Sequence, residues 1–158
     1  MLFSKPNNPL KALLREIKIS FKDFSLFETA FVHKSYVNEH KREKIEDNER
    51  LEFLGDAVLE LVTTEFLYKE FPKEGEGRLT NFRSALGKGN HLAEVRRAMG
   101  LGKYLQLSRG EEKGGGREKN YLLANTLEAL IGAIYLDRGF TAAHKFISRY
   151  ILTNLGEI

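Results

Sequence analysis

The sequence contains no cysteine, only three prolines, and no apolar stretch that approaches the length needed to cross a membrane. Without cysteine the chain can form neither disulfide bonds nor thiolate metal sites. Residues 1–14 include lysine, proline and asparagine in place of a long apolar segment, which argues against a secretory signal. We therefore expect a soluble protein of the cytoplasm that has no membrane partner.

What is present indicates a single domain of ordinary size. The chain has 158 residues, of which 42% are hydrophobic and 30% charged, and this balance is typical of a globular protein with a real core. The glycines at 114–116 match neither a P-loop nor a dinucleotide-binding fingerprint, so we expect no small-molecule cofactor. The four histidines are scattered without the spacing of metal ligands.

The charges are nearly balanced in number but not in position. The net charge is +3, from 25 basic and 22 acidic residues. Acidic residues are concentrated in 43–76, whereas 78–119 is rich in basic ones, and an acidic centre beside a basic surface suits a metal-assisted enzyme that acts on a polyanion. A solvated surface of mixed charge is equally consistent with composition alone. The basic residues are Arg78, Arg83, Lys88, Arg96, Arg97, Lys103, Arg109, Lys113, Arg117 and Lys119.

Capping residues and apolar periodicity predict an all-α fold, a compact helical bundle. No alternation of apolar and polar residues is long enough to indicate a strand, although 103–108 is short and extended in pattern. The glycine-rich segment 110–119 has no packing pattern and is predicted to be a mobile loop. Helices are predicted at about 9–17, 29–36 (after a capping box at 25–28), 48–70, 79–86, 90–99, 121–136 and 141–155.

An acidic stripe runs along the helix predicted at 48–70. Glu49, Glu52, Asp56 and Glu60 are three, four and four residues apart, which places all four side chains on one flank. Like charges at these spacings repel one another by a few tenths of a kcal/mol per pair. A helix that accumulates this repulsion beside its own apolar face is expected to hold a cation there.

The strongly apolar helix at 121–136 carries a second pair of oxygen-bearing side chains, Asn125 and Glu128. They are three residues apart and share a flank. A carboxylate on a largely buried helix is costly unless it is paired or bound to a metal. Oxygen-only ligands from two such helices suit Mg²⁺ or Mn²⁺ better than zinc. For Glu128 alone, pairing with a buried arginine such as Arg50 or Arg83 is the alternative.

At this point several segments resemble a known family. Residues 48–59, Asn-Glu-Arg-Leu-Glu-Phe-Leu-Gly-Asp-Ala-Val-Leu, resemble the signature of the ribonuclease III endonuclease domain. Residues 33–36 and 71–80 resemble the segments on either side of that signature, and 123–132 resemble the second acidic motif of the family. Because these motifs are long, ordered and correctly spaced over nearly the whole chain, the chain is identified as similar to a bacterial-type ribonuclease III endonuclease domain.

The resemblance implies an all-α homodimer that hydrolyses double-stranded RNA with a divalent metal, Mg²⁺ or Mn²⁺ as its substitute, and leaves 5′-phosphate and 3′-hydroxyl ends. It implies a role in RNA processing such as the maturation of ribosomal RNA precursors. It also makes Phe53 a plug at the dimer interface, whereas periodicity alone favours a simple core phenylalanine. By motif position the implied catalytic metal ligands are Glu52, Asp56, Asn125 and Glu128, with supporting roles for Glu49 and Glu76.

Two departures from the family pattern bear on activity. Asn125 stands where the family commonly has aspartate, which leaves open a catalytically silent domain that binds structured RNA or a ribonucleoprotein. A helical interaction module without an RNA role is a third possibility, although it leaves the acidic stripe unexplained. The second departure is length, since residues 1–158 are expected to form one endonuclease domain, with the C-terminal double-stranded-RNA-binding domain of bacterial relatives absent from this chain.

Overall fold

The computed structural model describes residues 8–88 and 90–153. The regular elements among these residues are all helices, and their one β-type contact is an isolated bridge between Val32 and Gln106, so the predicted all-α fold is confirmed. None of the described helices is long and apolar enough to cross a membrane. The α-helices are α1 (Leu10–Ile17), α2 (Phe24–Thr29), α3 (Lys34–Glu39), α4 (Glu49–Glu70), α5 (Glu76–Lys88), α6 (Asn90–Ala98), α7 (Arg109–Lys113), α8 (Asn120–Arg138) and α9 (Phe140–Ile147); 3-10 turns span Leu101–Tyr104 and Gly116–Glu118, and a π turn spans Ser148–Leu152.

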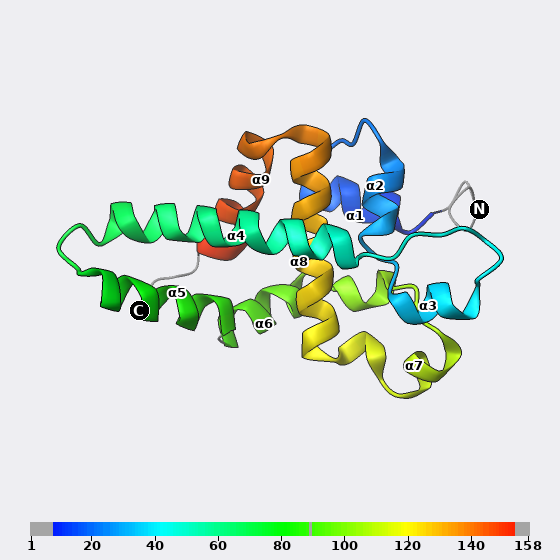
Figure 1. The fold of residues 1–158 in the computed structure, drawn as a ribbon. Coiled ribbons are helices and arrows are strands. Elements are labelled where there is room, and N and C mark those ends of the chain that lie inside the picture. The colour runs from blue at the N-terminus through cyan, green and yellow to red at the C-terminus, as the bar shows by residue number, and fades with distance from the viewer. Residues whose placement is uncertain (1–7, 89, 154–158) are drawn as a thin grey trace.

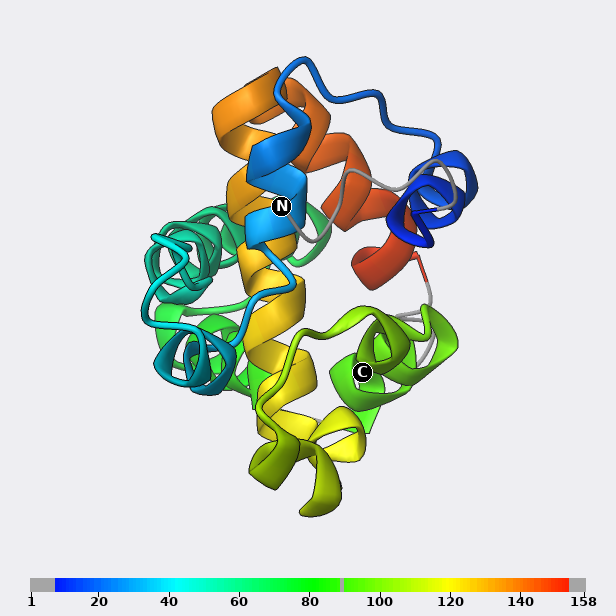
Figure 2. The same cartoon turned by 90° about the vertical axis from the view of Figure 1, so that its right-hand side faces the viewer.

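Helix α8 is the centre of the bundle, and α4 crosses it (Figure 1). The view turned by 90° shows the other helices arranged around α8 (Figure 2). On α8 the side chains of Leu127, Leu130, Ile131 and Ile134 are fully buried, as the apolar stripe at 121–136 predicts. This burial is the main stabilising contribution of the helix, since each such side chain contributes roughly 1.5–3 kcal/mol.

Two glycines let the backbones of α4 and α8 touch where they cross. A Cβ atom added to Gly55 would fall on the carbonyl oxygen of Glu128, and one added to Gly132 would fall on that of Leu51. Only glycine permits so close an approach. The crossing brings the acidic flank of α4 directly beside the flank of α8 that carries Glu128.

Gly55→Ala is therefore expected to destabilise the protein by about 2 kcal/mol, because the two helices must move apart to make room for the methyl group. The measurement is thermal or urea unfolding followed by circular dichroism. Gly77→Ala is the matched control, since that glycine also lies in a helix but has open space where a Cβ would be. Equal melting temperatures for the two variants would contradict the close crossing.

The prediction of one continuous helix at 29–36 is wrong. Helix α2 ends at Thr29 and α3 starts at Lys34, because the chain between them pairs with a distant segment: the Gln106 amide donates to the Phe31 carbonyl at 2.8 Å, and the His33 amide donates to the Gln106 carbonyl at 3.1 Å. The extended segment predicted at 103–108 is confirmed only around Gln106, because residues 103 and 104 belong to a 3-10 turn. Separate caps start the two helices, Asp23 for α2 and His33 for α3.

The prediction of a mobile loop at 110–119 is also wrong, because this segment forms α7 and a 3-10 turn. Ser108 caps α7 by accepting from the Glu111 amide. Arg117 donates from Nη1 to the carbonyls of Gly102 and Leu105, each at 2.9 Å, and Lys119 pairs with Glu111. Basic side chains hold the segment in place and are thereby partly withdrawn from the surface.

The remaining predicted helices differ from the observed ones mainly at their ends. Helix α5 starts at Glu76, three residues before its predicted start, so part of the glycine-rich turn is helical. The predicted helix 141–155 corresponds to α9 and the π turn that follows it. Its last two predicted residues, 154 and 155, lie outside the described residues.

Candidate metal centre

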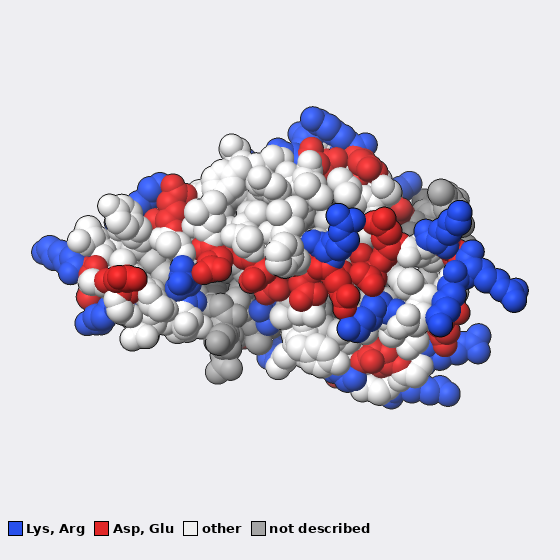
Figure 3. Space-filling view, in the orientation of Figure 1, with Lys and Arg blue, Asp and Glu red and all other residues white. Residues whose placement is uncertain are grey.

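The crossing of α4 and α8 forms a cleft of about 410 Å³ that is lined almost wholly by polar side chains. Figure 3 shows the acidic residues as a band across this face, while basic side chains gather mainly toward the end of the molecule that holds α3 and α7. The sequence predictions and the cleft agree closely, because six of the seven predicted site residues line it. They are Glu49, Glu52, Phe53, Asp56, Asn125 and Glu128.

The start of α4 is fixed by the residues just before it, and this sets the direction of the acidic flank. The buried Asn48 side chain donates to the carbonyl of Ala30 at 3.1 Å, and the Glu49 amide donates to Asp47 Oδ1 at 3.0 Å. The Asn48 amide also donates to the Val32 carbonyl at 2.9 Å. These contacts anchor α4 to the segment between α2 and α3.

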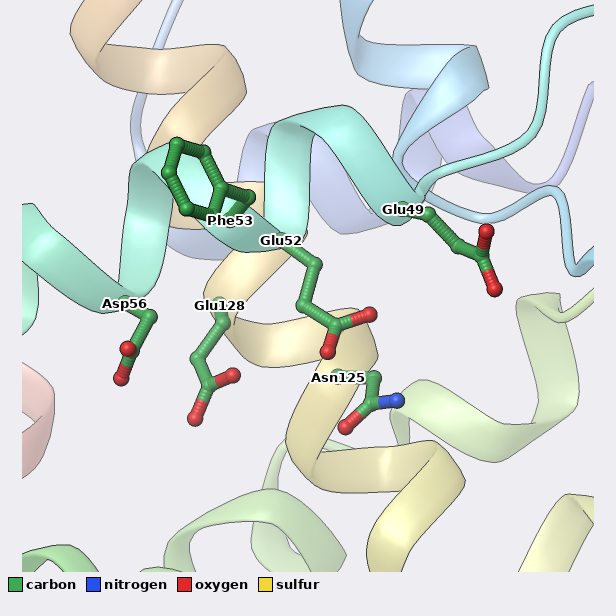
Figure 4. Close-up of a pocket in the computed structure, with 6 residues that line it drawn as sticks. All are labelled: Glu49, Glu52, Phe53, Asp56, Asn125 and Glu128. Carbon is green, nitrogen blue, oxygen red and sulfur yellow. The ribbon is translucent and has the colours of Figure 1, made fainter.

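Four of the six lining side chains point into the same space (Figure 4). Glu52 and Asp56 come from α4, and Asn125 and Glu128 come from α8. Glu49 points away from them (Figure 4) and forms an ion pair with Lys34 at 2.8 Å. Glu49 is therefore at the edge of the cleft, which fits a supporting role better than a ligand role.

Burial and the repulsion of neighbouring carboxylates both act on Glu128. Its pKa is raised to about 7, first by burial and then by the negative charges of Asp56 and Glu52, while Arg96 opposes the increase. The pKa of Glu52 is also raised, again mainly by burial and then by Glu49 and Asp56. Without a cation the carboxylates of this cleft thus disfavour one another's ionised forms.

The donor set fits a hard divalent cation. All four inward-pointing side chains offer oxygen, which Mg²⁺ and Mn²⁺ prefer, and a cation would relieve the repulsion at Glu128. The side chains stand apart, however: among the described residues no group of three or more His, Asp or Glu side chains is drawn together closely enough to hold a metal ion as it stands. The cleft brings the ligands to one place but does not preform their coordination.

The raised pKa predicts how the stability of the metal-free protein depends on pH. Since the pKa of Glu128 is about 7 in the folded state and 4.5 ordinarily, the folded state binds more protons between these values, and stability falls as the pH rises through about 7. We expect a lower melting temperature at pH 8 than at pH 6 in EDTA, and a smaller difference in Glu128→Gln. An unchanged difference in that variant would show that Glu128 is not its source.

Glu76 is the predicted site residue that the structure does not bring to the cleft. It lies at the start of α5 and lines a different cleft of about 490 Å³, beside the end of α4. That cleft also contains Tyr68 and Arg83. Glu76 therefore has no contact with the four ligand candidates within one chain.

Neither arginine named as an alternative partner forms an ion pair with Glu128 among the described residues, and Arg50 is exposed. Arg83 pairs with Glu60 at 3.1 Å, which leaves Glu60 as a surface residue, and Arg83 Nη1 also donates to Thr64. The positive charge that lowers the pKa of Glu128 belongs to Arg96, which sequence analysis grouped with the basic surface. A signal for its burial was present, since Arg96 is one helical turn after the apolar Leu92.

Phe53 is 83% exposed, so the interpretation as a core phenylalanine is wrong. Leu61 and Tyr68 on the same helix are 57% and 74% exposed. An exposed apolar stripe along one helix is typical of a protein–protein contact.

Comparison with solved structures identifies the class of protein. The fold matches the nuclease domain of ribonuclease III from Campylobacter jejuni with a TM-score of 0.84 and 40% identity, over 98% of this chain and 99% of that one. A second structure of that domain, with structural flexibility in a region involved in dimer formation, matches equally well over 92% of this chain and 98% of that one. The fold is thus that of a ribonuclease III nuclease domain, with the acidic cleft at the crossing of α4 and α8.

The Ribonuclease-III-like family model matches residues 23–155, and this chain belongs to that family. Ribonuclease 3 of Listeria monocytogenes strain HCC23 is 45% identical over 148 residues, which are 94% of this chain and 65% of that protein. Ribonuclease 3 of Chloroflexus aurantiacus is 51% identical over 140 residues, 87% of this chain and 57% of that protein. The chain thus spans less than two thirds of the length of these relatives.

Proposed function

We propose that this chain is an endoribonuclease domain that hydrolyses double-stranded RNA with a divalent metal. The metal is Mg²⁺, for which Mn²⁺ can substitute. The observation that carries the proposal is the convergence of four oxygen-bearing side chains from α4 and α8 on one cleft. The identity of 44–51% to proteins named Ribonuclease 3 supports the same function. RNA processing in the cytoplasm, including maturation of ribosomal RNA precursors, is the proposed cellular role.

In this mechanism Glu52, Asp56, Asn125 and Glu128 would hold the cation. When bound, the cation supplies a nucleophilic water and neutralises charge that develops on the scissile phosphate. Within the chain, the partly buried Glu128 points its carboxylate into the cleft (Figure 4), and the amide of Asn125 offers a neutral oxygen. The products would carry a 5′-phosphate and a 3′-hydroxyl.

The proposed assembly is a homodimer in which Phe53 docks on the partner. The exposed apolar stripe of α4 supports it, because two copies can bury this stripe against each other. RNA binding would depend on phosphate contacts and would weaken as salt is raised. Both strands could then be cut, one by each protomer.

Phe53→Ala is expected to raise the dissociation constant of the dimer by roughly tenfold or more. Phe53 is 83% exposed in the single chain and would be buried in the dimer, so the substitution removes the apolar surface that the dimer buries. The measurement is light scattering or sedimentation over a range of protein concentrations. Tyr121→Ala is a suitable control, since Tyr121 is an exposed aromatic residue outside α4. A parent protein that stays monomeric at high concentration would contradict the proposed assembly.

A second function has a specific observation in its favour. Asn125 brings no negative charge to a cleft that depends on charge for metal affinity, so the domain could bind structured RNA without cutting it. Retention of Glu52, Asp56 and Glu128 in the same cleft favours the active enzyme.

The experiment combines binding and cleavage on one substrate. The purified protein is incubated at low salt with long double-stranded RNA in Mg²⁺, in Mn²⁺ and in EDTA, and the ends of any fragments are identified enzymatically. Metal-dependent cleavage that leaves 5′-phosphate ends supports the proposal. Binding without cleavage would replace it with the silent domain, and a lack of binding at low salt would exclude both.

A further inference from the structure

Lys34 lies at the edge of the acidic cleft between α4 and α8 and is held there by an ion pair. It is the first residue of α3, and its Nζ is 2.8 Å from Oε1 of Glu49, which lines the cleft. Within residues 8–88 and 90–153, no other ion pair involves a residue that lines this cleft. Lys34 is therefore the basic side chain of the described residues that is joined directly to the cleft.

Stability does not account for a lysine at this position. The side chains of Lys34 and Glu49 are 58% and 54% exposed, and an ion pair between exposed partners contributes little to stability. Lys34 also lies in the first turn of α3, where the amide groups at the start of a helix disfavour a positive charge. Neither the ion pair nor the helix explains the residue, so we looked for a role outside the folded chain.

The backbone on both sides of Lys34 is fixed by contacts with a distant segment. The His33 amide donates to the Gln106 carbonyl at 3.1 Å. The Ser35 hydroxyl accepts from the Ser108 amide at 3.0 Å and is hydrogen-bonded to His33 Nδ1 at 2.8 Å. The residues just before His33 are in turn hydrogen-bonded to the start of α4. Lys34 thus extends from a well-anchored backbone toward the cleft.

The charges around Lys34 suit the approach of a polyanion. Basic side chains gather toward the end of the molecule that holds α3 and α7 (Figure 3), so Lys34 lies where this basic end meets the acidic cleft. The carboxylates of the cleft repel phosphate groups, and Glu49 points away from the four candidate ligands (Figure 4). The hydrogen bond and charge of Glu49 raise the pKa of Lys34, with further contributions from Asp47 and Glu52, against the effect of desolvation. Lys34 therefore stays positively charged beside the path of the RNA.

We propose that Lys34 is a substrate-binding residue whose ammonium group contacts an RNA backbone phosphate next to the scissile one, and that Glu49 holds the side chain at the cleft edge until RNA binds. An ammonium group has three donors on a flexible stem, so it can turn from a carboxylate to a phosphate without a change in the backbone. This inference rests on the proposed function.

The test is the binding of a fluorescently labelled RNA duplex to the metal-free full chain in EDTA, measured by anisotropy over a series of salt concentrations. Lys34→Met removes the charge from an exposed position, and circular dichroism establishes that it is folded. It is expected to raise the dissociation constant by roughly tenfold at about 0.1 M salt. The slope of log Kd against log salt should decrease by about 0.9 for each chain that contacts the duplex, because one phosphate contact is lost.

Lys69→Met is the matched control. Lys69 is also exposed and also pairs with a glutamate of α4, Glu65, at 2.7 Å, but neither residue lines the cleft. It removes the same charge from the protein, and the slope should equal that of the parent. Lys34→Arg keeps the charge and is expected to bind with the salt dependence of the parent. In single-turnover cleavage with Mg²⁺, Lys34→Met should raise the protein concentration at half-maximal rate and leave the maximal rate nearly unchanged, as loss of a binding contact does.

Equal slopes in Lys34→Met and Lys69→Met would overturn the inference. A lower maximal rate at an unchanged half-saturating concentration would also overturn it, because Lys34 would then act in the chemical step. A parent that does not cleave RNA in Mg²⁺ while Lys34→Met changes the slope as expected would overturn the proposed hydrolysis and support the phosphate contact. Absence of RNA binding by the parent in both EDTA and Mg²⁺ would overturn the proposed function and the inference together.

Discussion

Glu128→Gln is expected to reduce the rate of cleavage of double-stranded RNA by roughly 10³-fold while leaving the protein folded. A unit charge about 4 Å from a cation is worth roughly 4 kcal/mol at an effective dielectric constant of 20, and this energy corresponds to about three powers of ten in rate or affinity. Glutamine keeps the size and one oxygen of the side chain, so the loss isolates the effect of the charge. The measurement is single-turnover cleavage at saturating protein in Mg²⁺.

The folded state should not suffer from this substitution. The pKa of Glu128 is raised to about 7 by burial and by two neighbouring carboxylates, so the ionised side chain destabilises the metal-free protein near neutral pH. Glu128→Gln removes that repulsion and is expected to melt at a higher temperature than the parent in EDTA at pH 8. A variant that is more stable and yet inactive is the pattern that distinguishes a ligand from a structural residue.

The control for this experiment is Glu60→Gln. Glu60 belongs to the same acidic stripe of α4, but it is exposed and pairs with Arg83 on α5. Its substitution removes one negative charge from the stripe without touching the cleft, so cleavage should be retained. If Glu60→Gln and Glu128→Gln reduced cleavage equally, the overall charge of α4 and α8 would be responsible and Glu128 would have no special role.

The sequence predicts the two long helices well for a physical reason. Helices α4 and α8 have 22 and 19 residues, and their apolar and acidic residues repeat over several turns, so the pattern is strong and local. The pairing of Glu52 and Asp56 with Asn125 and Glu128 could also be predicted, because the two patterns complement each other chemically.

The incorrect predictions concern contacts between distant parts of the chain. The break between α2 and α3 depends on two backbone hydrogen bonds, in which the Gln106 amide donates to the Phe31 carbonyl and the His33 amide donates to the Gln106 carbonyl, and no local pattern reveals a partner so far away. The ordered segment after α7 likewise depends on Arg117 reaching the carbonyls of Gly102 and Leu105.

Site residues follow the same division. Glu76 matches the family by position along the chain, but the start of α5 places it in a different cleft. Arg96 looks like one more basic surface residue until the contact between α6 and α8 shows that it is buried. Sequence spacing specifies which residues share a helix face, whereas the face that meets a given neighbour is decided by the packing of the whole bundle.

Asn125→Asp is expected to tighten Mn²⁺ binding by roughly 10- to 100-fold and to raise cleavage at low Mg²⁺ by a similar factor. The added charge would contribute up to about 4 kcal/mol at 4 Å from the cation. Part of this gain is lost, because the new carboxylate also repels Glu52 and Glu128, whose pKa values are already raised. The expected effect is therefore smaller than the loss caused by Glu128→Gln.

The same repulsion separates this prediction from a general effect of charge. Without metal, Asn125→Asp should melt at a lower temperature than the parent at pH 8, and Mn²⁺ should restore its stability. Asn120→Asp adds a charge to the same helix at an exposed position that contacts Arg97. It should therefore neither lower the melting temperature of the metal-free protein nor make that temperature depend on Mn²⁺. Equal behaviour of the two variants would remove Asn125 from the ligand set. A parent that binds RNA without cutting it, beside an Asn125→Asp variant that cuts, would establish that the asparagine silences an otherwise complete active site.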